Sequence, residues 1–529
     1  MRVTPAKVLI AEELSPATIA ALGPDFTIEF CDGANRSELL KAIAEVDAVL
    51  IRSATKIDAE ALDAAKSLKI VARAGVGLDN VDVKAATARG VMVVNAPTSN
   101  IVSAAELAVG LLLASARNIA TANASLKSQE WKRSKFTGIE IADKTVGIIG
   151  LGRIGMLFAE RIAAFGVKLI AHDPYIQPAR AHQHGITMVS LDELIEQSDF
   201  ISIHSPKTPE TIGMISAEQL QRAKPNLHII NAARGGLIDE VALYEALASG
   251  QIAGAAIDVF AVEPCTDSPL FELDNVVVTP HLGASTHEAQ EKAGVAVAHS
   301  VRLALAGELV PDAVNVQGGA VAPELKPYLQ LTEKLGHLLT SLSNSAFSKI
   351  EVEVFGDILE YDIRVLELSA LKGVFQSLIH DSVSYVNAPL LAKERSVLSE
   401  VKSGGESPDH KSLVRVIGYN ASGEKLSVAG TISGSKVHEQ ILEINEFEVD
   451  QPVATHLVLM KYHDRPGVVG AVGKILGDAG VNIVSMQVSP AREAEHSLMV
   501  LGIESSLTSS ILQAIGDEIG AHFTKSVDF

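Results

Sequence analysis

The sequence predicts an α/β protein of four domains, the first two of which are built on parallel β-sheets. Three observations lead to this prediction. The chain has 529 residues, too many for one core, because a domain typically holds ~100–200 residues. Short apolar stretches alternate with amphipathic stretches as far as residue 286, as strands and helices do around parallel sheets. Beyond residue 319, alternating apolar and charged residues instead favour strands with one solvent-facing side.

The first part of the chain is predicted to form one parallel sheet. Its five apolar stretches cover residues 7–11, 26–30, 47–51, 69–75 and 91–95. Between them, residues 15–23 and 36–46 have the apolar spacing of helices. Ser15 followed by Pro16 is typical of a helix start, because serine caps the helix and proline fits its first turn. A longer helix is predicted from residue 101 to 117.

A second series of strands predicts a doubly wound domain over residues 99–286. Its six apolar stretches cover residues 145–150, 168–173, 200–206, 228–233, 254–260 and 275–280. A helical stretch at 287–307 follows and can return the chain to the first sheet. The first domain would then comprise residues 1–98 and 287–318.

The last two hundred residues are predicted to form two α+β domains. Residues 314–327 have the glycine, proline and polar content of a linker. Residues 319–452 would form an intervening α+β domain, with a strand at 348–356 and a hairpin at 413–432 that turns at Asn420 to Gly423. Residues 453–529 have the order strand, helix, strand, strand, helix, strand.

The composition excludes several classes of partner. Hydrophobic residues make up 47% and charged residues 20% of the chain, which argues against disorder. The net charge of −20, without a long run of either sign, argues against nucleic acid and anionic membranes as main partners. An anionic substrate would therefore need a local cluster of arginines.

Cysteine usage and apolar segments favour a cytoplasmic protein. Cys31 and Cys265 are distant in sequence and can build neither a disulfide framework nor a zinc cluster, so no metal site is expected. The N-terminal stretch has too short an apolar run for a signal peptide. The most apolar helical stretch, residues 103–116, contains Glu106 and is shorter than the ~20 residues that cross a bilayer.

Residues 145–155, "TVGIIGLGRIG", predict a dinucleotide-binding turn. Gly150, Gly152 and Gly155 follow a predicted strand and open a predicted helix, the context that gives this glycine spacing its meaning. Gly150 permits the tight turn, Gly152 lets the backbone approach a pyrophosphate, and Gly155 lets the helix pack close to the strand. Asp173, at the end of the next strand, can bind ribose hydroxyls and repel a 2′-phosphate. The motif predicts a Rossmann-type domain that binds NAD rather than NADP.

Polar side chains at three further strand ends predict a catalytic site. Arg234, Asp258 with Glu263, and His281 each follow an apolar stretch, and ligands of such sheets bind outside the carboxyl ends of the strands. His281 can take the proton of an alcohol, and Glu263 can orient its ring. Arg234 can bind a carboxylate or carbonyl oxygen through its planar guanidinium. Alone, Arg234 would better suit a surface ion pair and Glu263 a solvated loop acid, but together with the cofactor turn they favour oxidation of a secondary alcohol by NAD.

The sequence resembles the D-isomer-specific 2-hydroxyacid dehydrogenase family. The similarity rests on "GLGRIG", "NAARGGLIDE", "AAIDVFAVEP", "PHLGAST" and, in the first domain, "RAGVGLDNVD". It implies that Arg234, Glu263 and His281 are catalytic, and that the Rossmann-type domain is inserted in a flavodoxin-like substrate domain. It also implies that NAD is contacted by Arg153, Ile154, Asp173, Ser205, Ala232, Asp258, Gly283 and Ala284.

Arginines that follow two strands of the first domain suit the phosphorylated hydroxy acid that the resemblance implies, and ion pairs within a helix or loop are the alternative. Arg52 with Ser53 ends one predicted strand, and Arg73 ends another. The resemblance adds Val76, Gly77 and Asn100 as substrate contacts. It also places Trp131, Arg133 and Lys135 near the cleft of a partner subunit.

The order of all four regions resembles family members that carry an intervening domain and a C-terminal ACT domain of ferredoxin-like fold. This resemblance implies a homotetramer that oxidises 3-phospho-D-glycerate to 3-phosphooxypyruvate, the first step of L-serine biosynthesis. Glyoxylate or hydroxypyruvate reductases share the core but usually lack the C-terminal domains. An NADH-sensing binding protein of the same fold is a second alternative, and the complete Arg, Glu and His set favours the enzyme.

Residues 462–486 match the pattern of an ACT effector site. Asp464 ends the first predicted strand of this domain and Asn482 begins the second. The resemblance implies that Tyr462, Asp464 and Asn482 bind L-serine between paired ACT domains. A dimerisation module that binds no ligand is the alternative.

Overall fold

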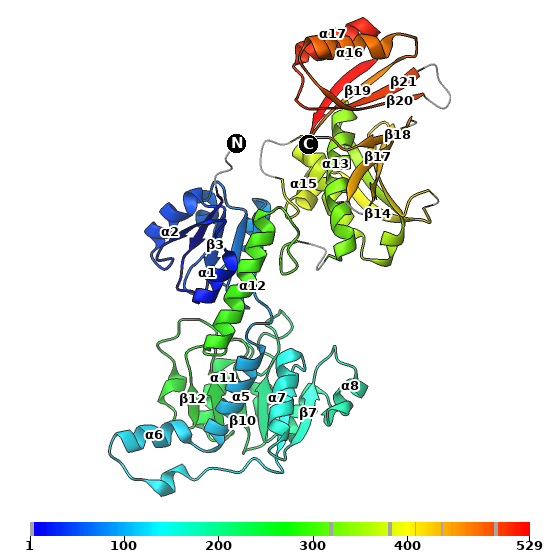
Figure 1. Ribbon diagram of the computed structural model, residues 1–529. Coiled ribbons are helices and arrows are strands. Elements are labelled where there is room, and N and C mark those ends of the chain that lie inside the picture. Colours follow the sequence, from blue (N-terminus) through cyan, green and yellow to red (C-terminus); the bar gives the residue numbers. More distant parts are fainter. Residues whose placement is uncertain are drawn as a thin grey trace.

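The computed structural model describes residues 5–316, 321–378, 383–407, 409–434, 437–445, 447–490 and 496–529. Four β-sheets form among these residues, and Figure 1 shows the first sheet between the second and the third, with the fourth beyond the third. Two sheets are wholly parallel and belong to the N-terminal part of the chain, whereas the last is wholly antiparallel. The α/β fold class predicted from the sequence is confirmed.

The first sheet has the flavodoxin-like strand order β2-β1-β3-β4-β5, with all strands parallel. Its strands are β1 (Lys7–Ile10), β2 (Thr27–Phe30), β3 (Ala48–Ile51), β4 (Ile70–Arg73) and β5 (Met92–Val94). The helices between them are α1 (Pro16–Leu22), α2 (Arg36–Ala42), α3 (Ala59–Ala64) and α4 (Val83–Ala88). As predicted, Ser15 caps α1, because its side chain accepts a hydrogen bond from the backbone N–H of Ala17.

Helix α12 (His287–Leu305) returns the chain to this first sheet, as the sequence indicated. It packs along α1, and in Figure 1 it connects the first sheet with the second. Val297 and Val301 of α12 join the same buried cluster as Val8 of β1. Beyond the helix, Asn315 Oδ1 accepts a hydrogen bond of 2.9 Å from the backbone N–H of Val93.

The second sheet is a seven-stranded parallel sheet of order β12-β11-β10-β9-β6-β7-β8. Its strands are β6 (Thr145–Ile149), β7 (Lys168–His172), β8 (Ile186–Met188), β9 (Phe200–Ile203), β10 (His228–Asn231), β11 (Gly254–Ile257) and β12 (Val276–Val278). The strand order reverses between β6 and β9, which is where such sheets bind ligands. The sequence did not reveal β8, which is only three residues long.

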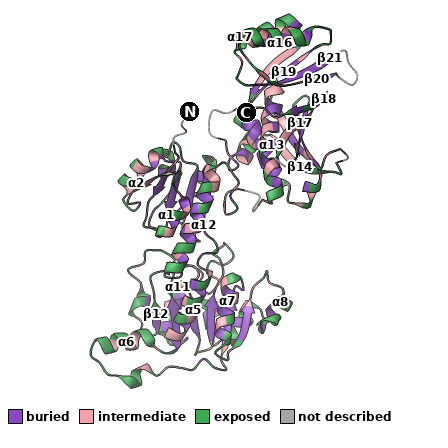
Figure 2. Cartoon of the chain, in the orientation of Figure 1, coloured by how far each residue is buried: buried purple, intermediate pink, exposed green. Residues whose placement is uncertain are grey.

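Helices cover both faces of this sheet. On one face lie α5 (Ile101–Ala116) and α7 (Arg153–Ala163); on the other lie α9 (Leu191–Gln197), α10 (Ala217–Gln221) and α11 (Glu240–Ala248). The short helices α6 (Ile119–Lys127) and α8 (Pro178–Gln183) lie at its periphery. Figure 2 shows the strands as buried and the outer helix faces as exposed. Among the described helices none alone is long and apolar enough to cross a membrane, and only the pair α5 and α6, bent by 66°, passes that test together.

The third sheet is a mixed sheet of six strands in the order β14-β13-β15-β16-β17-β18. The strands are β13 (Phe347–Gly356), β14 (Leu398–Gly405), β15 (Ser412–Asn420), β16 (Lys425–Ser433), β17 (His438–Ile444) and β18 (Phe447–Pro452). Helices α13 (Lys326–Leu342), α14 (Arg364–Gln376) and α15 (Ala388–Glu394) accompany them. The predicted hairpin is confirmed as β15 and β16, with its turn at Asn420 to Gly423.

The last sheet has the order β20-β21-β19-β22, which is the ferredoxin-like arrangement expected of an ACT domain. Its elements are β19 (His456–His463), α16 (Val468–Asp478), β20 (Ile483–Pro490), β21 (His496–Ile503), α17 (Ser509–Ile519) and β22 (Phe523–Asp528). Val458 and Met460 of β19 pack beneath the helices, whereas Leu457 and Leu459 join the core around α13. Because successive side chains point to opposite faces, both sides of β19 are buried.

The four sheets support the predicted division of the chain into four domains, which stays a proposal. The first domain would comprise residues 1–98 and 287–318, and the others residues 99–286, 319–452 and 453–529. The core around α13 also contains Leu457 and Leu459 of the last sheet, so the third and fourth units share buried apolar residues. Residue 1 and the predicted boundary between residues 318 and 319 lie outside the described residues.

One buried histidine of the second sheet is expected to make this part of the chain sensitive to acid. His228 stacks on Phe200, and its Nδ1 lies 2.8 Å from Ser115 Oγ on α5. Burial lowers the pKa of His228 to about 4, so the folded chain keeps this ring neutral. The unfolded chain binds the proton at ~6.5, so stability is expected to fall by up to ~3 kcal/mol as the pH drops from ~6.5 to ~4.

Calorimetric unfolding at several pH values checks this expectation. The variant His228→Asn should show a weaker loss of stability with acid than the wild-type chain. His299→Asn, which changes an exposed histidine of α12, should keep the wild-type dependence. An identical dependence in His228→Asn and wild type would contradict the assignment.

Candidate active site

The glycine turn after β6 has the geometry that a dinucleotide requires. Gly150 has a φ of +91°, and a Cβ there would lie 2.7 Å from Ser205 Oγ. A Cβ on Gly155 would lie 2.1 Å from the carbonyl oxygen of Gly150, so helix and turn are in close contact. A Cβ on Gly152 would meet nothing within 4 Å, and no side chain caps the start of α7 at this residue. The turn therefore leaves open space beside free helix N–H groups, which suits a pyrophosphate.

Asp173 lies beside this turn, directly after β7. Its Oδ2 accepts a hydrogen bond of 2.8 Å from the backbone N–H of Leu151, and its Oδ1 accepts one of 2.8 Å from that of Tyr175. Arg153 and Ile154 form the first turn of α7, and the Arg153 side chain is exposed. A carboxylate held in this way can accept further hydrogen bonds from ribose hydroxyls.

His281 and Glu263 form a hydrogen-bonded pair beyond the carboxyl ends of β12 and β11. His281 Nδ1 lies 2.6 Å from Glu263 Oε2, and Glu263 Oε1 accepts a hydrogen bond of 2.9 Å from the backbone N–H of Phe260. The side chains of His281 and Glu263 are 47% and 33% exposed, so solutes can reach the ring. His281 has a φ of +55°, a conformation that costs energy outside glycine and often marks functional positions.

Asp258 holds the segment that carries His281. Its side chain is fully buried and accepts hydrogen bonds from Thr279 Oγ1 at 2.6 Å, Leu282 N at 2.7 Å and Gly283 N at 3.0 Å. Burial raises the pKa of Asp258, and these three hydrogen bonds oppose the shift. In this structure its contacts are with the 279–283 segment, so the arrangement gives Asp258 a positioning role that the sequence did not suggest.

Helix α5 contacts the 279–283 segment through Ser103. Ser103 Oγ lies 3.1 Å from the carbonyl oxygens of both Gly283 and Asn100. The carbonyl oxygen of Ala232 would lie 3.8 Å from a Cβ on Gly283. The expected contacts Asn100, Ala232 and Gly283 therefore lie close together. Ser103, which the sequence did not single out, connects two of them.

Arginines from both parallel sheets meet at Gly77. A Cβ on Gly77 would lie 2.9 Å from Asp79 Oδ2, 3.4 Å from Arg234 Nη2 and 3.8 Å from Arg73 Nη1, so one carboxylate of the chain lies beside the two arginines. Burial lowers the pKa of Arg73, Asp79 opposes this shift, and Arg234 lowers the pKa further. Among the described residues the buried Nε of Arg73 has no hydrogen-bond partner. Two neighbouring guanidinium groups in this state would be stabilised by an anion.

Glu12 and Asn80 hold the loop that carries Arg52 and Ser53. Glu12 Oε1 accepts hydrogen bonds from the backbone N–H groups of Arg52 at 2.8 Å and Thr55 at 2.9 Å. Asn80 Nδ2 donates to the carbonyl oxygens of Arg52 at 2.7 Å and Thr55 at 2.6 Å. Neither positioning residue was predicted, although an acid directly after the first strand was a usable signal for Glu12.

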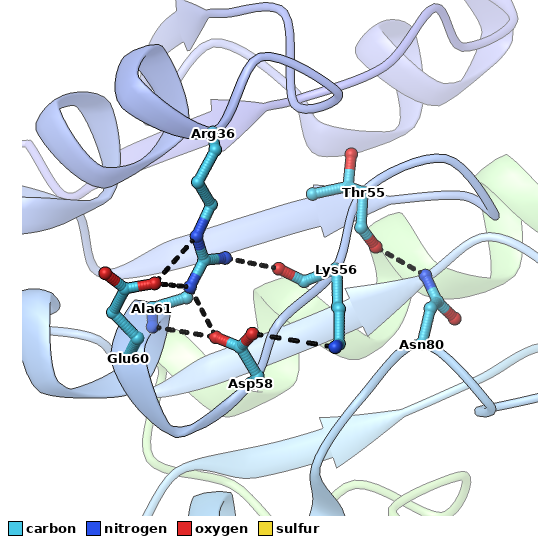
Figure 3. Close-up of polar contacts among 7 residues, drawn as sticks. All are labelled: Arg36, Thr55, Lys56, Asp58, Glu60, Ala61 and Asn80. Atoms are coloured by element: carbon cyan, nitrogen blue, oxygen red, sulfur yellow. Dashed lines mark hydrogen bonds and ion pairs between the residues drawn. The ribbon is translucent and has the colours of Figure 1, made fainter.

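An ion-pair network fixes the far end of the same loop (Figure 3). The Arg36 guanidinium pairs with Asp58 at 2.5 Å and Glu60 at 2.6 Å, and it donates to the carbonyl oxygen of Lys56 at 3.1 Å. These contacts join α2 to the start of α3. They restrain the segment between β3 and α3 at a point beyond the Asn80 contacts.

Other expected site residues lie away from these groups or contribute differently. Trp131 is 78% exposed, and Lys135 pairs with Asp274 at 2.9 Å. With Arg133 they lie just after α6, which Figure 1 shows extending away from the body of the chain. Ser53 is exposed, whereas the carbonyl oxygen of Val76 accepts a hydrogen bond from Asn95 Nδ2 at 2.5 Å.

The three residues expected at the effector site differ in their exposure to solvent. Asp464 directly follows β19, Asn482 directly precedes β20, and both are exposed. Tyr462 is 1% exposed and belongs to the core beneath the helices. Burial raises its pKa, and the nearby Asp464 carboxylate adds to the shift. The expectation that the Tyr462 side chain contacts an effector therefore does not agree with its burial, because its position in β19 turns it toward the core.

Comparison with known proteins places the chain in a family. Residues 109–283 match the model of the D-isomer specific 2-hydroxyacid dehydrogenase NAD binding domain. Residues 324–445 match the D-3-phosphoglycerate dehydrogenase intervening domain, and residues 456–520 match the ACT domain. The D-3-phosphoglycerate dehydrogenase of Mycobacterium leprae is 54% identical over 515 residues, which cover 97% of this chain and 98% of the relative.

The chain belongs to the D-3-phosphoglycerate dehydrogenase family. The family's relative from Methanocaldococcus jannaschii is 40% identical over 96% of this chain and 97% of its own length. Among solved structures, a glyoxylate reductase from Paecilomyes thermophila is 30% identical with a TM-score of 0.53, covering 59% of this chain and 99% of its own. A protein from Thermus thermophilus is 33% identical with a TM-score of 0.54, covering 58% and 99%. Like its family, the chain is an NAD-dependent oxidoreductase.

Proposed function

We propose that this chain oxidises 3-phospho-D-glycerate to 3-phosphooxypyruvate with NAD, the first step of L-serine biosynthesis. The observation that carries the proposal is the His281–Glu263 pair, 2.6 Å apart, on a sheet that also bears the glycine turn. The arginines that meet at Gly77 support an anionic substrate. The full-length similarity to D-3-phosphoglycerate dehydrogenases supports the phosphorylated one.

The proposed mechanism assigns proton transfer to His281. The residues around the glycine turn would hold NAD, which would supply the acceptor for the hydride on C2 of the substrate. Nδ1 of His281 is engaged by Glu263, so Nε2 is the nitrogen that takes the proton of the C2 hydroxyl. Glu263 fixes the ring and stabilises the imidazolium that forms, and Arg234 holds the substrate through a carboxylate or carbonyl oxygen.

Binding of the two anionic ends is assigned to the first sheet. Val76, Gly77 and Asn100 are proposed to receive the carboxylate, and Arg52, Ser53 and Arg73 the phosphate. The residues proposed to hold NAD are Gly150, Gly152, Arg153, Ile154, Gly155, Asp173, Ser205, Ala232, Asp258, Gly283 and Ala284. Asp258 is proposed to support NAD binding indirectly, because its carboxylate holds Leu282 and Gly283 in place.

One assay separates this function from its alternatives. NADH formation is measured with 3-phospho-D-glycerate and with unphosphorylated D-2-hydroxy acids. Strong preference for the phosphorylated substrate is the expected result. Equal rates would favour a glyoxylate or hydroxypyruvate reductase. Binding of NADH without turnover of any substrate would favour a sensing protein.

Arg52→Gln is expected to weaken recognition of the phosphate. Loss of one charge-assisted contact of ~1.5–3 kcal/mol raises KM for 3-phospho-D-glycerate by ~10–100-fold. Turnover of unphosphorylated D-glycerate should stay unchanged, because it lacks the phosphate. Steady-state kinetics check this result, with Arg89→Gln, which removes a surface ion pair with Asp63, as the matched control. An unchanged KM in Arg52→Gln would remove Arg52 from the phosphate site.

The ACT domain is proposed to bind L-serine through Asp464 and Asn482. Both residues are exposed, and they lie at opposite ends of the sheet, because β19 and β20 both run antiparallel to β21. One serine would therefore be shared between paired ACT domains, with the Asp464 carboxylate pairing with its ammonium group. Calorimetric titration of the whole chain with L-serine should give binding that Asp464→Ala abolishes. Asp478→Ala, at the other end of α16, should bind as the wild type does. Absence of any serine binding would favour a dimerisation module.

The enzyme is proposed to act as a cytoplasmic homotetramer. The cytoplasmic setting rests on the two free cysteines, both partly buried. Burial raises the pKa of Cys31 to about 11, and the Glu38 and Asp32 carboxylates add to the shift, so this thiol stays protonated. The tetramer rests on family resemblance, and analytical ultracentrifugation of the purified chain tests it.

A further inference from the structure

Three histidines of the last sheet lie against one another. His463 ends β19 and His496 begins β21, and the two are directly opposite in the antiparallel register. His522 precedes β22, and its backbone N–H donates a hydrogen bond of 2.7 Å to the carbonyl oxygen of Lys461. Three segments that are separate in sequence therefore meet at one end of the sheet.

The rings are close enough to share one ligand. Their centroids are 4.3 Å apart for His463 and His496, 4.9 Å for His463 and His522, and 4.5 Å for His496 and His522. Each residue offers one ring nitrogen, and the three nitrogens all lie within 4.8 Å of one another. His463 and His522 are exposed and His496 is half-buried, so a solute can approach the cluster.

Three imidazoles are a donor set for a transition-metal cation. Imidazole suits Zn²⁺, Co²⁺, Ni²⁺ and Cu²⁺, and three protein ligands leave a fourth position of a tetrahedral ion for water. With Zn–N distances of ~2.0–2.1 Å, the nitrogens of a tetrahedral site lie ~3.3 Å apart. In the structure the ring nitrogens lie up to 4.8 Å apart. Rotamer changes that move the nitrogens of the exposed His463 and His522 by ~1 Å would bring the three to the spacing that zinc requires.

We propose that His463, His496 and His522 bind one divalent transition-metal cation, for which Zn²⁺ is the best fit. The site lies outside the cluster of His281, Arg234 and Arg73, and it does not depend on the function proposed above. The metal would join β19, β21 and the start of β22. Because the metal would bind the folded chain and not the unfolded one, it would raise the temperature at which this domain unfolds.

Metal titration of the whole chain tests the site. The protein is purified without a histidine tag and treated with a chelator, and Co²⁺ is then added. The expected result is one Co²⁺ per chain with the visible absorption of a tetrahedral ion, displaced by Zn²⁺ and accompanied by a higher unfolding temperature. His522→Gln, in a loop before β22, should weaken binding by at least ~10-fold because one of three ligands is lost.

A matched control separates this site from adventitious binding by surface histidines. His438→Gln changes an exposed histidine of β17 and should bind Co²⁺ as the wild type does. His496→Gln removes a different ligand and should reproduce the effect of His522→Gln, with far-UV circular dichroism confirming that both variants fold. Absence of stoichiometric Co²⁺ binding, or equal affinity in wild type and both cluster variants, would overturn the proposal.

Discussion

Replacing His281 with asparagine is expected to lower kcat by ~10²–10⁴-fold, the contribution of a positioned general base. Asparagine is the suitable replacement because it tolerates the positive φ of +55° at this position. It cannot take up the proton of the substrate hydroxyl. The affinity for NADH, measured by fluorescence titration, should stay near that of wild type, because the backbone contacts of the 279–283 segment with Asp258 are retained.

Two further variants make this result specific. Glu263→Gln keeps a hydrogen-bonding group opposite His281 Nδ1 but removes its charge, so a smaller loss of kcat is expected. His287→Gln changes an exposed histidine at the start of α12 and should leave kcat unchanged. Full turnover by His281→Asn would refute the assigned proton transfer.

Alanine at two neighbouring glycines is expected to have opposite effects on stability and on NADH binding. At Gly155 a Cβ would lie 2.1 Å from the carbonyl oxygen of Gly150, so helix and turn must separate. Such overpacking costs ~1–3 kcal/mol and should lower Tm by ~2–10 °C. At Gly152 a Cβ would meet no protein atom within 4 Å, so Tm should stay unchanged.

The effect of Gly152→Ala should instead appear in cofactor binding. Its Cβ would point into the open space proposed for the pyrophosphate, and we expect the Kd for NADH to rise by ~10-fold or more, a cost of ~1.4 kcal/mol. Calorimetry measures Tm and fluorescence titration measures the Kd for NADH, and Gly152→Ala is the control for the Tm effect of Gly155→Ala. Wild-type NADH affinity in Gly152→Ala, or a wild-type Tm in Gly155→Ala, would contradict the respective assignment.

Much of the fold could be predicted because its signals are local. The continuous apolar stretches that became β1, β3 and β9 are typical of strands covered on both faces. Strand β8 was missed because Thr187 interrupts its three residues, whereas the equally short β5 and β12 are continuously apolar. Tyr462 lies two residues after Met460 and faces the core as Met460 does, so strand alternation directs its side chain away from solvent.

The sequence by itself determined the α/β class, the glycine turn and the edge of the sheet at which Arg234, Glu263 and His281 lie. These follow from local patterns, together with the rule that ligands bind at the carboxyl ends of parallel strands. Only the tertiary structure decided that Arg73 and Arg234 meet at Gly77, and that three distant histidines form one cluster where the sequence predicted no metal site. Neither has a sequence signal, because strand order and domain packing, rather than local spacing, bring such residues together.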